Sequence, residues 1–242
     1  MLTAENVVGK IVIFICEKTV GKLITLPFDK RKKACRSLTK LYYCVQCLDD
    51  VTDAVFRSVE DFKGQGDASA VVNSLNNHMH EVELATNMFI DIGYELSGGL
   101  EIIDPVLAQC CNVLYVGKFD FLSFMSKSIA WDRSGENAKI VVKIPKGLAD
   151  SVDMQDMYDR TSVALGKGEK FYWPDSALDE FREDFQTFSI EWENDEAARK
   201  FLQTLSRQRE MLSMAKNQLR ELLKESFSIE EILFQTDSQP YE

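Results

Sequence analysis

The sequence predicts a mainly α-helical protein, a long-helix bundle built on an antiparallel αα-hairpin, with a small irregular, β-containing insertion around 131–174. Three observations predict this fold: few helix-breaking residues, a long heptad pattern of apolar residues, and a second heptad pattern close behind it. The 242 residues include five prolines and twelve glycines, which is few for this length and favours long helices. An apolar fraction of 45% and a charged fraction of 28% are those of an ordinary globular protein.

Residues Thr3 to Val20 predict the first helix, with Thr3 as its N-cap. Its apolar residues cover more than half of the helix circumference; they are Val7, Val8, Ile11, Val12, Phe14 and Ile15. The helix is therefore either deeply buried or suited to enter another apolar phase. A strand over Ile11–Cys16 is the alternative interpretation, because β-branched residues dominate that run.

The first heptad pattern predicts the central helix of the bundle. All but one of its seam residues are apolar; they are Ala34, Leu38, Leu41, Val45, Leu48, Thr52, Val55, Val59 and Phe62. Apolar residues beside the seam widen it into the face of a bundle helix rather than a two-stranded coiled coil. We expect Thr25 or Asp29 to cap the start of this helix and Gly64 to end it.

A second heptad pattern, from Val72 to Leu96, follows a short connection and predicts the antiparallel partner of the hairpin, 29–96. Ser97-Gly98-Gly99 is expected to end this partner helix. Asp104-Pro105 is a typical N-cap and first-position pair, and predicts a third helix through about Lys127.

From Trp131 to Pro174 the pattern changes. Lys139–Ile144 is the best strand candidate, and a lone strand is unstable, so we expect it to pair with Phe171-Tyr172-Trp173 or with a second subunit. Met154–Leu165 predicts a short helix, and the residues that follow it predict a turn.

The C-terminal part predicts two helices. The first is acidic, opens at Pro174-Asp175-Ser176 and places Phe185 and Phe188 on its inner face. The second is long, is capped by Asn194 or Asp195, and carries the polar Gln208 in an otherwise apolar seam. A polar seam residue can determine register or partner choice. The expected organisation is a helical bundle over 1–130, the insertion over 131–174 and the C-terminal helices over 175–235, all packed in one domain.

Charge is distributed unevenly along the chain. The net charge is −11, yet residues 1–40 hold nine basic and three acidic residues, leaving 19 basic and 36 acidic residues in the other 202. Lys30-Arg31-Lys32-Lys33 occupies the first turn of the central helix, where the helix dipole disfavours cations. With Arg36 it predicts contact with an anionic surface or a protein partner, or with the chain's own acids, such as those of Asp179–Asp195. Nucleic acid is disfavoured, because the rest of the surface would repel phosphates.

Residues that could carry chemistry are few. His78 and His80 with Glu81 and Glu83 resemble a metal-ligand pattern, but the two histidines point in different directions on a helix, so a solvated face is the better interpretation. The C-x-x-C pattern Cys44–Cys47 lies in mid-helix, where no helix terminus lowers the thiol pKa, and the cysteines are interpreted as small core residues. We therefore predict no catalytic, cofactor-binding or metal-binding residues and no cofactor.

The function that best fits these features is a non-enzymatic helical interaction or scaffold protein. It would act through protein–protein contacts or self-association as a homo-oligomer, with Gln208 as a register residue. No secretory signal and no apolar run of membrane-spanning length is recognised, so the expected location is the cytoplasm, including the periphery of a membrane. One alternative is a membrane-acting effector that uses the apolar N-terminal helix and the basic cluster at 30–36. A second alternative is an enzyme with a site in the 131–174 region.

Overall fold

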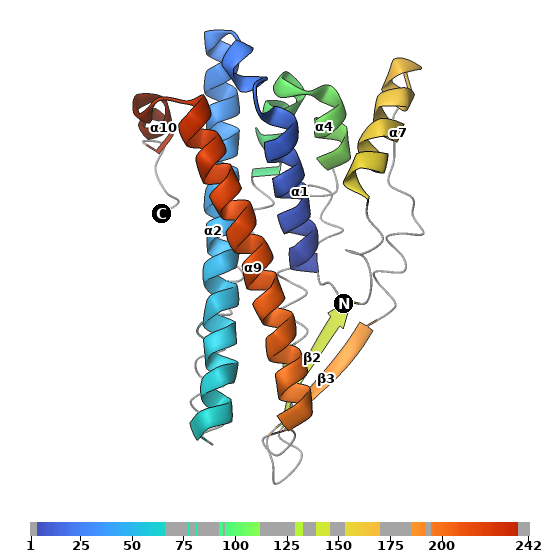
Figure 1. The fold of residues 1–242 in the computed structure, drawn as a ribbon, viewed down its shortest axis with the longest axis vertical. Coiled ribbons are helices and arrows are strands. Elements are labelled where there is room, and N and C mark those ends of the chain that lie inside the picture. Colours follow the sequence, from blue (N-terminus) through green and yellow to red (C-terminus); the bar gives the residue numbers. More distant parts are fainter. Residues whose placement is uncertain are drawn as a thin grey trace.

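The computed structural model describes residues 4–65, 77, 81, 92–93, 95–111, 129–132, 139–145, 153–169, 185–191 and 195–236. Within these residues the protein is mainly α-helical, which confirms the predicted fold class (Figure 1). In chain order the elements are α1 (Ala4–Thr19), the 3₁₀ helix η1 (Leu23–Thr25), α2 (Phe28–Gln65), α4 (Pro105–Cys110), β1 (Ile129–Asp132), β2 (Lys139–Pro145), α7 (Met154–Gly166), β3 (Phe185–Glu191), α9 (Asp195–Ser226) and α10 (Ile229–Thr236).

The centre of the bundle is the long helix α9, which packs against both α1 and α2. The predicted seam of α2 forms its buried face over the part whose side chains are described, from Ala34 to Thr52. Thr52 is the polar member of that seam, and its hydroxyl donates to Leu48 O at 2.7 Å, so it enters the core without an unpaired donor. On α9 the buried stripe includes Leu212, Ala215, Leu219 and Leu222.

Helix α1 is buried in this bundle. It is a helix rather than a strand, and Ile11, Val12 and Ile15 are fully covered. Gly9 allows the close approach of α1 to α9, because a Cβ at this position would lie 2.5 Å from Met211 Cγ. Of the two predicted environments, the structure therefore places the apolar face of α1 in the protein core.

The start of α2 differs from the prediction. Its first helical hydrogen bond runs from Arg31 N to Pro27 O at 2.8 Å, so neither Thr25 nor Asp29 is the N-cap. The Thr25 hydroxyl instead donates to Lys22 O and closes η1. Pro27 is itself the N-cap: its carbonyl accepts the first helical hydrogen bond, and it has no N–H to leave unpaired. At the other end α2 continues past Gly64 to Gln65.

The prediction that Ser97-Gly98-Gly99 ends a helix is wrong, because residues 95–103 are continuously helical. Gly99 has a packing role instead: a Cβ there would overlap Ser37 Oγ of α2. The Ser37 hydroxyl donates to Glu95 O at 2.9 Å and joins the two helices. Most of the second heptad and its connection lie outside the described residues, so the hairpin 29–96 stays a prediction.

Helix α4 begins as predicted, with Asp104 accepting from Val106 N at 2.9 Å and Leu107 N at 3.2 Å. It ends at Cys110, well short of Lys127, and residues 112–128 lie outside the described part. The short helix predicted at Met154 is α7.

The three strands form an antiparallel sheet in the order β1-β2-β3, at the end of the bundle away from the α1–α2 corner (Figure 1). The predicted strand is β2, and it pairs with β1 and β3 rather than with Phe171-Tyr172-Trp173 or another subunit. The prediction that Phe185 and Phe188 lie on an acidic helix is wrong, because both belong to β3. Its aromatic and β-branched residues favour a strand, and β2 needs a partner on each edge. The division into 1–130, 131–174 and 175–235 is not tested and stays a prediction.

Candidate functional site

The side chains of the predicted basic cluster differ in their surroundings. Arg31 turns inward and binds Glu231 of α10 through two hydrogen bonds, Nε to Oε1 at 2.8 Å and Nη2 to Oε2 at 3.1 Å. The same guanidinium donates to Ser226 O and lies 5.2 Å from the centroid of the Phe227 ring. Arg31 therefore attaches the C-terminal helix α10 to the start of α2.

Glu231 is prepared for this contact by its own helix. Ser228 and Glu231 form a capping box, with Ser228 N donating to Oε2 at 2.8 Å and Glu231 N donating to Ser228 Oγ at 3.2 Å. The hydrogen bond from Arg31 lowers the pKa of the Glu231 carboxyl, and so does the Ser228 backbone. The Ser-x-x-Glu spacing is readable in the sequence and could have predicted α10.

We expect replacement of Arg31 by methionine to loosen α10 selectively. The substitution removes a two-point charged hydrogen bond whose loss costs about 2 kcal/mol, equivalent to about 30-fold faster amide hydrogen exchange in α10. Lys32→Met is the matched control, because it removes an exposed cation one residue further along α2 and should leave exchange in α10 unchanged. Equal exchange in both variants would contradict this role for Arg31.

Arg36 also binds an acid of the chain itself. Its Nη2 lies 3.2 Å from Glu95 Oε1, and Lys40 Nζ lies 2.6 Å from Glu95 Oε2. Burial raises the pKa of the Glu95 carboxyl, but the two cations outweigh it and the net pKa is lowered. Among the described residues, Arg36 and Lys40 thus bind Glu95 and Arg31 binds Glu231; the acidic side chains of the predicted segment Asp179–Asp195 lie outside the described part.

The remaining cations, Lys30, Lys32 and Lys33, are exposed and adjoin three exposed apolar side chains at the corner between α1 and α2. The exposed fractions are 61% for Val20, 65% for Ile24 and 63% for Phe28. We call these six residues the apex surface, because the corner lies at the top of the bundle in Figure 1.

The corner is held in shape from within. Gly21 has φ of 78°, which lets the chain reverse after α1, and Leu23 is fully buried and anchors η1. Lys32 Nζ lies 4.5 Å from the centroid of the Phe28 ring, so the apolar and basic parts of the apex surface are in contact. Sequence reasoning missed the apolar part, although the four-residue spacing of Val20, Ile24 and Phe28 is visible in the sequence.

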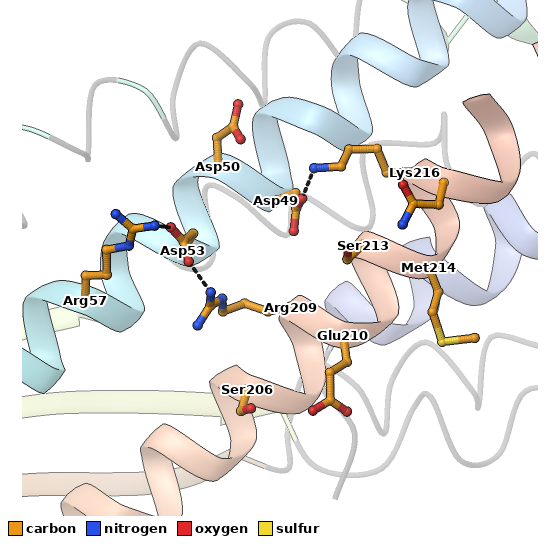
Figure 2. A pocket seen from close by; sticks show the side chains of 11 residues that line it. Asp49, Asp50, Asp53, Arg57, Ser206, Arg209, Glu210, Ser213, Met214 and Lys216 are labelled. Carbon is orange, nitrogen blue, oxygen red and sulfur yellow. Dashed lines mark hydrogen bonds and ion pairs between the residues drawn. The ribbon is translucent and has the colours of Figure 1, made fainter. Parts of the chain in front are cut away.

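A groove of about 800 Å³ lies between α2 and α9 (Figure 2). Asp49 binds Lys216 across it, and Asp53 binds both Arg57, at 2.7 Å, and Arg209. The pairs Asp49–Lys216 and Asp53–Arg209 join α2 to α9, whereas the pair Asp53–Arg57 lies within α2. Among the described residues, no group of three His, Cys, Asp or Glu side chains could hold a metal ion.

A second polar cluster lies where α1, α4 and α7 meet. The buried Asp104 carboxylate accepts from Lys22 Nζ at 2.5 Å and from the Tyr158 hydroxyl at 2.6 Å, in addition to capping α4. Burial raises the pKa of Asp104, yet the bonds from Lys22 and Tyr158 outweigh it and lower the net pKa. Burial and the Asp104 hydrogen bond raise the pKa of Tyr158 to about 12. At neutral pH the cluster is therefore a stable carboxylate–ammonium–phenol arrangement.

The cysteines lie in hydrophobic surroundings. Burial raises the pKa of Cys44 to about 12 and raises that of Cys47 above its ordinary value, so both thiols of the C-x-x-C pattern are protonated at neutral pH. Of the predicted metal-like group, His78, His80 and Glu83 lie outside the described residues and the Glu81 side chain is exposed. Gln208 lies in α9, but its side chain is outside the described part.

Two further findings bear on function. In the described part of the chain, no helix has the length and apolar character needed to cross a membrane. No protein-family model, no curated protein and no solved structure matches this chain. The chemistry of its own residues therefore carries the functional inference.

Proposed function

We propose that the protein is a non-enzymatic helical interaction protein that binds its partner through the apex surface. The observation that carries the proposal is the exposure of Val20, Ile24 and Phe28 together at one corner. Exposing large apolar side chains is unfavourable in water, by about 25 cal/mol for each Å² of apolar area. A single exposed apolar side chain is normal, whereas a group of them rimmed by polar or charged residues is typical of an interaction site.

Preorganisation supports the proposal. Two residues in and next to the corner are held by partly buried contacts: Lys22 by the Asp104 carboxylate and Arg31 by Glu231. A binding surface that is already ordered loses little conformational freedom when its partner arrives.

The apex surface replaces the heptad seams as the proposed contact. The seam of α2 from Ala34 to Thr52 and that of α9 from Leu212 to Leu222 are buried in the protein's own core. Residues that are covered in this way have no free face for a partner helix. Self-association through Gln208 and a cytoplasmic location stay predictions.

Site-specific photo-crosslinking tests the proposal even while the partner is unidentified. A photoreactive amino acid placed at Ile24 or Phe28 should give discrete adducts with protein or with lipid in cells. The matched control is Val163 on α7, which is 59% exposed and lies outside the apex surface. Adducts from the apex positions and none from Val163 would support the proposal. Identical adducts from all three positions, or none from the apex, would overturn it.

A further inference from the structure

We infer that the partner of the apex surface is an anionic membrane, on which the protein docks corner-first with α1 still packed in the bundle. This inference rests on the proposed function, since it names the partner of the same surface. It differs from insertion of α1, whose apolar residues contact α9 and are not available at the surface.

Charge complementarity is the first argument. In the described part of the chain Lys22, Arg31, Arg36 and Lys40 each bind a carboxylate, whereas Lys30 and Lys33 form no ion pair and Lys32 contacts the Phe28 ring. The three exposed lysines lie on α2 within five residues of Phe28, and Asp29 in the same helical turn offsets one of the three charges. Basic side chains beside apolar ones match the headgroup and acyl layers of an anionic bilayer.

The shape of the surface is the second argument. Val20, Ile24 and Phe28 come from the end of α1, from η1 and from the start of α2, at an outer corner of the bundle (Figure 1). A bilayer interface accepts projecting apolar side chains without a preformed pocket, while the long lysine side chains extend towards the headgroups.

The charge of the rest of the chain is the third argument. Residues 41–242 contain 19 basic and 36 acidic residues, so an anionic membrane repels most of the protein. The basic end of the chain, residues 1–40, holds nine basic and three acidic residues, which favours an orientation with this end towards the membrane. The exposed apolar residues of the corner lie at that same end.

Co-sedimentation of the intact protein with vesicles tests the inference. Vesicles of phosphatidylcholine with about 30% phosphatidylserine should bind the protein at low salt, and pure phosphatidylcholine should not. High salt should weaken binding, because added ions screen the lysines. The triple variant K30Q/K32Q/K33Q should bind on the order of 100-fold more weakly, since each lysine near an anionic surface contributes about fivefold.

Matched control variants test whether the loss of binding depends on the corner itself or only on the total charge and exposed apolar area of the protein. The triple variant R57Q/R160Q/R207Q removes the same number of exposed cations from α2, α7 and α9 away from the corner, and should bind like the wild type. V20S/I24S/F28S should lose binding, whereas V163S/M214S, which changes exposed apolar residues elsewhere, should keep it. Equal losses in the corner variants and their controls would overturn the inference.

Hydrogen exchange decides how the protein docks. Amides of α1 should exchange equally slowly in solution and on vesicles, and faster exchange on vesicles would overturn docking with α1 packed. Absence of vesicle binding by the wild type at every salt concentration would overturn the membrane as partner. Protein adducts from Ile24 in the crosslinking experiment would then still support the proposed function, with an acidic protein as partner. Failure of both experiments would overturn both proposals.

Discussion

Replacing Asp104 by alanine should lower the free energy of unfolding by about 3 kcal/mol. The side chain makes three kinds of contact at once: it caps α4, binds Lys22 and accepts from Tyr158. Loss of an N-cap costs about 1 kcal/mol, and loss of hydrogen bonds to a charged group adds about 2 kcal/mol. Denaturant unfolding monitored by circular dichroism would measure the difference.

Asp153→Ala is the matched control for this substitution. Asp153 caps α7 by accepting from the equivalent two backbone donors, Gln155 N at 2.9 Å and Asp156 N at 3.1 Å, but it is exposed, and within the described part of the chain no ammonium or phenol contact accompanies the cap. Its replacement should cost about 1 kcal/mol, the value of a cap alone. Similar losses in the two variants would show that Lys22 and Tyr158 add nothing.

The Asp104 contribution should also depend on pH in a defined direction. Because the pKa of Asp104 is lowered on folding, its stabilising effect is complete above the pKa of the unfolded state. It is lost as the pH falls through the lower pKa of the folded state. The difference in unfolding free energy between wild type and Asp104→Ala should therefore shrink on acidification. Denaturant unfolding at several pH values would measure this change.

Replacing Ile11 by alanine should destabilise the protein by about 3 kcal/mol, within the range for truncating a buried aliphatic side chain. Ile11 is completely buried in the core between the helices. Removal of its outer carbons leaves a cavity that a close-packed bundle fills only in part. Ile24→Ala makes the same chemical change at an exposed position of η1 and should change stability by less than about 0.5 kcal/mol.

The comparison of these two isoleucines also tests the alternative of a membrane-acting effector. If Ile11→Ala were as mild as Ile24→Ala, α1 would contribute little to the fold and could leave the bundle at small cost. A large loss for Ile11 alone would mean that α1 is an integral part of the bundle. The exposed corner would then be the part of this region that is free to contact a membrane.

Much of the helical framework was predictable because its signals are local. The apolar period of α2 follows from residues three and four apart, and Asp104-Pro105 specifies a helix start through neighbouring atoms. The wrong predictions have non-local causes. Gly99 continues a helix because Ser37 of another helix requires close approach, and Phe185 lies in a strand because β2 needs a partner.

The candidate site was predictable only in part. The run Lys30 to Lys33 stands out in the sequence, but as a single cluster of cations. The Ser-x-x-Glu capping box of α10 was equally local and was overlooked. The exposure of Val20, Ile24 and Phe28 has no local signal that separates it from burial, because apolar residues spaced four apart also describe a core face.

The sequence by itself determined the helical class, the length of α2, the cap of α4 and the unusual basic segment, since each depends on residues within a few positions of one another. Only the tertiary structure decided which cations bind a carboxylate of the chain itself. Arg31 is partly buried and binds Glu231, 200 residues away, and Arg36, although exposed, binds Glu95, 59 residues away. Such pairs form because packing brings distant segments together, and burial of α1 and α2 against α9 sets that packing. The result is a corner on which apolar side chains and lysines stay exposed together.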